Sequence, residues 1–218
     1  MIGTTADVKP RVAELLREAT QWRLIAVLFS CPQGDCWHSE VAALASEVAD
    51  EQLQAAAEAA LAEASEGLYH TTFGPGGPAA VRQVSYLHST LSGQFLADLR
   101  GMYEAFAYQA TSEEPPDHVA VQADFVGYLR LKEAFAQTRG EEEHAAVTAD
   151  AVQRILDEHL SIIAEPLSRS LAASGISYLA GAAAALLQRV GPPRHTTPQT
   201  EDAFPVVAPG GLPEWQDA

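Results

Sequence analysis

The chain has 218 residues, which is enough for one domain with a sizeable core or at most two small ones. Hydrophobic residues make up 47% and charged residues 19%, a balance that is typical of globular proteins and excludes a largely disordered chain. The formal net charge of −16 disfavours binding to a DNA or RNA backbone and favours a cationic partner such as a basic peptide.

The sequence has no feature of an exported or membrane protein. The two cysteines, Cys31 and Cys36, do not make a disulfide framework. The N-terminal residues are charged and lack the apolar core of a secretion signal. The longest apolar run, residues 176–187, has only about 12 residues and is too short to cross a bilayer. We therefore expect a soluble protein of the cytoplasm.

Apolar residues recur at three- and four-residue spacing over much of the chain, which predicts helices. The first helix is expected over residues 7–29 and ends before Pro32, because proline cannot continue the hydrogen-bond ladder. A polar turn at residues 33–35 precedes a second helix with Ser39 as its N-cap. A third helix is expected over residues 51–68.

Glycines and prolines divide the middle of the chain. They predict a loop over residues 69–78, after which a helix is expected over residues 79–110, with a break near Ser92-Gly93 as an alternative. A break at residues 111–116 then leaves Asp117 as a natural N-cap for a helix that stops near Gly140.

Three further helices are expected over residues 148–163, 166–173 and 176–190. Six prolines follow without apolar periodicity, which predicts an extended tail. The expected fold is therefore all-α: a single-domain helical bundle over residues 1–191 and an extended Pro-rich C-terminal tail over residues 192–218.

One group of residues has the chemistry of metal ligands. Cys31, Cys36 and His38 form a Cys-x4-Cys-x-His pattern, and thiolates with imidazole suit zinc. A fourth ligand is not evident, and the plain alternative is two ordinary thiols in a turn at a helix end. We expect no resident metal or cofactor, and we keep a small metal-binding helical module as an alternative.

Signals for an enzyme are weak. The sequence has no Gly-x-Ser-x-Gly turn, and the glycine-rich residues 74–77 lack the Lys-Ser/Thr of a phosphate-binding loop. Asp117 and His118 could act as an acid–base pair in a hydrolase, but no third group that would orient them is evident. We expect a protein that is not an enzyme, with the hydrolase as a second alternative.

Residues 114–129 resemble the signature of the TorD/DmsD/NarJ-like family of redox-enzyme maturation chaperones, which centres on a Pro-x-Asp-His turn before a helix. The residues that agree with it are Pro116, Asp117, His118, Val119 and Phe125. The residues that depart from it are Gln122 and Asp124, which stand where the family usually has Glu, and Val126, which stands where it often has Met.

Two other stretches resemble family motifs in the same order. Residues 22–32 are similar to its Tyr-Arg-Leu-Leu-Ala-x-Leu-Phe opening, with Trp22 in place of Tyr, and residues 69–75 are similar to its Tyr-x-x-Leu-Phe-x-Gly loop, with Thr72 in place of Leu. The resemblance covers about residues 10 to 190.

The resemblance implies an all-α cytoplasmic chaperone. Such proteins bind the twin-arginine signal peptide, or another N-terminal segment, of the catalytic subunit of a molybdoenzyme, and they delay export until the cofactor is inserted. It also implies a possible weak contact with guanine nucleotide or molybdopterin guanine dinucleotide, and a monomer or a homodimer. No nucleic-acid partner and no stable membrane insertion are expected.

The expected peptide-binding residues are Trp22, Phe73, Tyr86, Pro116, Asp117 and His118. The aromatic rings would meet the hydrophobic part of the peptide, Asp117 would face an arginine, and His118 would orient the peptide or the turn. The alternatives are core packing for the aromatic residues and a simple N-cap role for Asp117.

Overall fold

The computed structural model describes residues 5–87 and 92–191, and within these ranges it contains helices and no strand, which confirms the all-α prediction. The helices, in chain order, are α1 (Thr5–Leu28), α2 (Gly34–Glu47), α3 (Glu51–Glu63), α4 (Glu66–Phe73), the 3-10 turn η1 (Gln83–Tyr86), α5 (Ser92–Ala105), α6 (Val119–Arg139), α7 (Glu142–Ile155), the π turn η2 (Leu156–Leu160), α8 (Ser161–Ala172) and α9 (Ser177–Val190).

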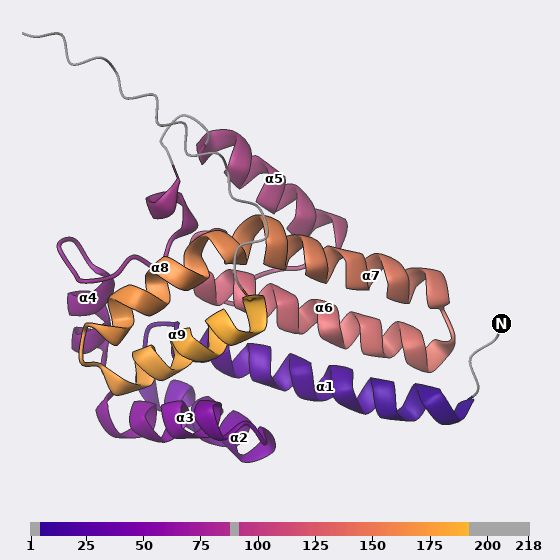
Figure 1. Ribbon diagram of the computed structural model, residues 1–218, viewed down its shortest axis with the longest axis horizontal. Coiled ribbons are helices and arrows are strands. Elements are labelled where there is room, and N and C mark those ends of the chain that lie inside the picture. The colour runs from indigo at the N-terminus through magenta and orange to yellow at the C-terminus, as the bar shows by residue number, and fades with distance from the viewer. Residues whose placement is uncertain (1–4, 88–91, 192–218) are drawn as a thin grey trace, which may run out of the picture.

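Helices α1, α6 and α7 lie side by side as long rods, and α1 packs along most of α6 (Figure 1). Gly127 favours this close approach, because a Cβ atom there would lie only 3.2 Å from the Ala19 carbonyl oxygen of α1. Fully buried side chains such as Ile25 of α1 and Phe125 of α6 fill the contact. Helices α1 and α6, which contain two of the three stretches that resemble family motifs, therefore form the centre of the core.

Ion pairs connect the N-terminal and middle turns of α1 to the C-terminal half of α6. The Glu133 carboxylate of α6 is almost fully buried and accepts hydrogen bonds from Arg11 at 3.1 Å and from Arg130 at 2.7 Å. Arg130 also pairs with Glu18 of α1 at 2.7 Å. A buried carboxylate is tolerated when charged donors surround it in this way.

Helix α2 begins five residues earlier than predicted, at Gly34. Ser39 is therefore inside the helix and not its N-cap, and its hydroxyl donates to the Asp35 carbonyl at 2.9 Å. The reason is tertiary. The indole N–H of Trp37, which is buried, donates to the Val27 carbonyl of α1 at 3.0 Å and fixes the first turn of α2 against α1.

The prediction of one helix over residues 51–68 was wrong at its end, because α3 ends at Glu63 and a separate helix, α4, begins at Glu66. Ser65 caps α4, and its hydroxyl accepts a hydrogen bond from the Leu68 N–H at 3.2 Å. Residues 69–73, expected to be loop, therefore form the last turns of α4.

The predicted helix over residues 79–110 was wrong over residues 79–87 and after Ala105, where α5 ends. Around η1, the backbone pairs instead with the segment that leads into α6. The Gln83 N–H donates to the Asp117 carbonyl at 3.0 Å, and the Val119 N–H donates to the Val81 carbonyl at 2.9 Å. This pairing between segments that are distant in sequence outweighs the local helical propensity.

The two helices predicted over residues 148–163 and 166–173 form one continuous helical run, from α7 through η2 to α8. Pro166 lies inside α8, not at its start. The run bends between α7 and α8, where the π turn lies (Figure 1). Helix α9 matches its prediction closely.

No helix in the described ranges is both long enough and apolar enough to span a bilayer. The predicted Pro-rich tail, residues 192–218, lies outside the described residues.

Candidate functional site

The turn that leads into α6 is built around His118, which caps the helix. Its backbone adopts the extended conformation of an N-cap, and its Nδ1 atom accepts a hydrogen bond from the Ala120 N–H at 3.1 Å. The ring is almost fully buried, and burial lowers the pKa of His118 to about 4. The imidazole is therefore neutral near pH 7, as an acceptor at the positive end of a helix requires.

The other nitrogen of His118 connects the turn to α4. Because Nδ1 is an acceptor, Nε2 carries the proton and donates to the Tyr69 hydroxyl at 3.0 Å. The Tyr69 hydroxyl in turn donates to Glu114 at 3.4 Å. Burial and the nearby Glu114 carboxylate raise the pKa of Tyr69 well above its usual value, so its hydroxyl keeps the proton it donates.

Asp117 is completely buried, and its carboxylate binds the segment around η1 instead of α4. One carboxylate oxygen accepts from Arg82 at 3.1 Å and 2.9 Å, and the second accepts from the Val84 N–H at 3.2 Å. Asp117 therefore holds the irregular segment around η1 against the start of α6. The N-cap role expected for Asp117 was wrong by one position, because the side chain that caps α6 is that of His118.

A pair of buried amides lies behind the turn. The Gln122 Nε2 atom donates to Gln83 Oε1 at 2.8 Å and to the Asp117 carbonyl at 3.1 Å. Gln122 Oε1 and Gln83 Nε2 have no hydrogen-bond partner among the described residues. A glutamate at position 122 would be a carboxylate acceptor and could not donate these two hydrogen bonds.

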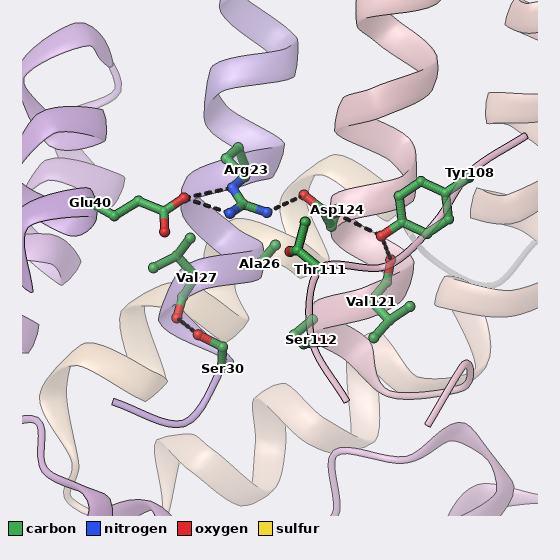
Figure 2. Close-up of a pocket in the computed structure, with 11 residues that line it drawn as sticks. Arg23, Ala26, Val27, Ser30, Glu40, Tyr108, Thr111, Ser112, Val121 and Asp124 are labelled. Carbon is green, nitrogen blue, oxygen red and sulfur yellow. Dashed lines mark hydrogen bonds and ion pairs between the residues drawn. The ribbon is translucent and has the colours of Figure 1, made fainter. Parts of the chain in front are cut away.

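A pocket of about 160 Å³ lies beside the first turns of α6. It is lined by residues of α1, α2, α6 and the segment after α5 (Figure 2). Arg23 lies between two carboxylates, with Nε 2.8 Å from Glu40 and Nη1 2.6 Å from Asp124. The Tyr108 hydroxyl donates to the second Asp124 oxygen at 2.7 Å. Burial and Asp124 raise the pKa of Tyr108, which therefore stays protonated.

Part of this region matches a known family pattern. The family model described as Nitrate reductase delta subunit matches residues 41–163, more than half of the chain.

The chain belongs to the nitrate reductase delta subunit family.

This is the NarJ/TorD-type family of chaperones, which serve the maturation of molybdoenzymes and are not catalysts. A comparison with curated proteins finds no match. The segments around Tyr69 and His118 lie inside the part that matches the nitrate reductase delta subunit family, and Arg23 and Glu40 lie outside it.

The structure brings most of the expected binding residues to one turn. Phe73 is half-buried and stacks edge-on against the Tyr69 ring, with centroids 5.1 Å apart. Tyr86 is half-buried in η1, and its hydroxyl donates to the Ala80 carbonyl at 2.7 Å. Pro116 is half-buried, and its carbonyl accepts from Tyr103 at 2.7 Å. Pro116 thus belongs to the turn that contains Asp117 and His118, and Phe73 and Tyr86 lie on segments that hydrogen-bond to this turn through Tyr69 and Val84.

Trp22 is not part of this group. Its side chain is buried between α1 and α6, near Gly127, and belongs to the core of the molecule. A peptide could reach it only if these helices separated, so the expectation that Trp22 contacts a peptide stays a prediction that this structure does not favour.

Sequence reasoning missed the partners that give the site its geometry. Arg82 and Tyr108 had no sequence signal, because each acts through a contact with a distant residue. Arg23 and Tyr69 did have one, since both occur in the stretches that resemble family motifs, but only the structure shows which groups they bind.

The two alternative sites suggested by the sequence fit the structure poorly. Within the described residues, Cys36 and His38 belong to no group of three side chains that could hold a metal ion. Asp117 and His118 are both buried and engaged with different partners, Arg82 and Tyr69, so they are not arranged as an acid–base pair.

Proposed function

We propose that this chain is a maturation chaperone that binds the N-terminal segment of the catalytic subunit of a molybdoenzyme. In this proposal the segment is a twin-arginine signal peptide or its equivalent, and binding delays export until the cofactor has been inserted. The observation that carries the proposal is the family match over residues 41–163, which includes the Asp117-His118 turn.

The surface around this turn supports the proposal. Phe73, Tyr86 and Pro116 offer partly exposed apolar area on segments that the hydrogen bonds of Asp117 and His118 hold together. Such a surface suits the hydrophobic stretch of a signal peptide. In this arrangement Asp117 and His118 position the turn, and the half-buried rings make the contact.

The cationic part of the peptide needs an accessible carboxylate. Asp117 is fully buried and already paired with Arg82, so an arginine of the peptide would have to displace Arg82 to reach it. Glu114 adjoins the same turn, and about a third of its side chain is exposed. We infer that Glu114 faces an arginine of the peptide, helped by the net charge of −16.

The test is calorimetric titration of the full chain with a synthetic peptide that corresponds to the N-terminus of a molybdoenzyme catalytic subunit. We expect the wild type to bind and a peptide with both arginines replaced by glutamine to bind much more weakly. Phe73→Ala should weaken binding about 10- to 100-fold, as truncation of an apolar anchor typically does.

The matched pair for the charge contact is Glu114→Gln against Glu113→Gln, since Glu113 is the exposed neighbour. We expect roughly a fivefold loss for the first and none for the second. Equal binding by both variants would refute the role of Glu114. Failure of the wild type to bind any molybdoenzyme leader would refute the function itself.

Three further expectations from the family remain part of this proposal. The chain would act in the cytoplasm, because the client's cofactor is inserted before export. It would do so as a monomer or a homodimer. Weak binding of guanine nucleotide or of molybdopterin guanine dinucleotide is checked by equilibrium dialysis with guanosine triphosphate, and sedimentation velocity determines the oligomeric state.

A further inference from the structure

Cys31, Glu66 and His70 come together where the end of α1 meets α4. The thiol sulfur, a carboxylate oxygen and an imidazole nitrogen all lie within 4.8 Å of one another. Among the described residues, this is the one group of three or more such side chains close enough to hold a metal ion. It shares only Cys31 with the pattern that the sequence suggested.

The spacing is close to what a zinc ion requires. Zinc bonds of about 2.0–2.3 Å at tetrahedral angles place neighbouring ligand atoms about 3.4–3.6 Å apart. The His70 Nε2 and Glu66 Oε1 atoms are already 3.5 Å apart. Both side chains are exposed on consecutive turns of α4, and small rotations about their side-chain bonds can bring them to the half-buried Cys31 sulfur.

The donor set also indicates the class of ion. A thiolate with an imidazole and a carboxylate suits zinc and similar divalent transition metals, whereas Mg²⁺ and Ca²⁺ prefer oxygen ligands alone. Burial raises the pKa of Cys31, and the negative charge of the nearby Glu66 and Glu114 carboxylates adds to this effect. A bound cation reverses this effect, because a coordinated thiol loses its proton.

We propose that Cys31, Glu66 and His70 form a binding site for one zinc ion, with a fourth position open to water. The ion joins the end of α1 to α4. Because α4 also carries Tyr69, which holds His118, zinc binding stabilises the turn at the start of α6. The site does not depend on the client peptide, so it can be tested separately from the proposed function.

The experiment uses the reduced full-length chain, freed of metal with a chelator. Zn²⁺ affinity is measured by competition with a chromophoric chelator, and Co²⁺ is added separately to detect the sulfur-to-cobalt charge-transfer band. We expect one ion per chain, a charge-transfer band in the wild type, and a higher melting temperature with Zn²⁺ than without it.

Variants identify the ligands. Cys31→Ser and His70→Gln should each weaken Zn²⁺ binding by about tenfold or more, since each removes one direct ligand, and Cys31→Ser should abolish the charge-transfer band. Cys36→Ser and His38→Gln are the matched controls and should bind as the wild type does. Circular dichroism of each metal-free variant verifies that the helices are intact.

Three outcomes would overturn the proposal. The first is the absence of stoichiometric Zn²⁺ binding by the wild type. The second is binding that His70→Gln and Glu66→Gln leave unchanged; because both residues are exposed, these variants test the site even if Cys31→Ser fails to fold. The third is a charge-transfer band that Cys36→Ser removes and Cys31→Ser does not, which would place the ion at the other cysteine.

Discussion

At the scale of the residue, His118 joins three parts of the chain through one neutral ring. Its Nδ1 atom accepts from the backbone of α6, its Nε2 atom donates to Tyr69 of α4, and its backbone N–H donates to the Pro115 carbonyl at 2.9 Å. A protonated imidazole could not accept at Nδ1 and would lie at the positive end of a helix. The role of this residue therefore depends on its being uncharged.

We predict that His118→Ala lowers the free energy of unfolding by about 1–3 kcal/mol, because the N-cap acceptor and the partner of the Tyr69 hydroxyl are both lost. His118→Asn should lose less, since an amide oxygen can still cap the helix. Urea denaturation measures both changes. Equal losses for the two variants would show that capping contributes nothing at this position.

The pH dependence follows from the lowered pKa of His118, about 4 in the folded chain against 6.5 for an ordinary histidine. Between these values the unfolded chain binds more protons than the folded one, so stability falls as the pH falls from 6.5 to 4. The expected loss from His118 is about 3 kcal/mol, at about 1.4 kcal/mol per pH unit.

The measurement is urea denaturation at several pH values, for the wild type and for His118→Asn. The variant should lose less stability than the wild type between pH 6.5 and 4. Some loss should remain in the variant, because burial also lowers the pKa of His159 to about 4. Identical pH profiles for the two proteins would contradict the prediction.

At the scale of the element, the contact between α1 and α6 determines where the other helices lie. Gly127 allows the two backbones to approach, Glu133 and Arg130 add partly buried ion pairs, and the start of α6 is fixed by the turn that contains His118. Gly140, with φ 69°, ends α6 in the left-handed conformation that favours glycine. The end of α6 is thus defined locally, whereas its start and its position depend on contacts with distant parts of the chain.

We predict that Gly127→Val destabilises the protein by about 1–3 kcal/mol, because a branched side chain there overlaps the backbone of α1. The matched control is Gly101→Val in α5, where the added Cβ meets no atom within 4 Å beyond its own stretch of helix. The control should change stability by no more than about 0.5 kcal/mol. Thermal melts of both variants make the comparison, and equal effects would mean that the close approach is not important.

At the scale of the whole molecule, segments far apart in sequence meet at one end of the bundle. The end of α1, all of α4 and the start of α6 gather there (Figure 1), and this is where the turn and the proposed zinc ligands lie. At the opposite end of the bundle, the ion pairs of Glu133 join the start of α1 to the last turns of α6. The molecule therefore has one end rich in candidate binding groups, held in place by the core.

We predict that a chain ended after Pro193 keeps the helical domain folded. The segment that follows is rich in proline and has no apolar periodicity, so it contributes little to a core. A cooperative thermal melt within a few degrees of the full chain is the expected result. Loss of the cooperative melt would mean that the domain boundary near residue 191 is wrong.

Local properties of the sequence were enough to predict part of this protein. Apolar spacing and the positions of proline and glycine indicated an all-α fold, the end of α6 at Gly140 and the whole of α9, because each depends on neighbours within a few residues. The motif resemblance at Asp117 and His118 likewise indicated the family.

Long-range contacts decided the rest. Asp117 binds Arg82, 35 residues away, and His118 binds Tyr69, 49 residues away. As a result, residues 79–87 form no α-helix, and His118 is the cap of α6. Cys31 likewise meets Glu66 and His70, not its sequence neighbours Cys36 and His38. A buried polar group binds whichever partner the packing of the helices brings within reach, and local sequence patterns do not reveal that partner.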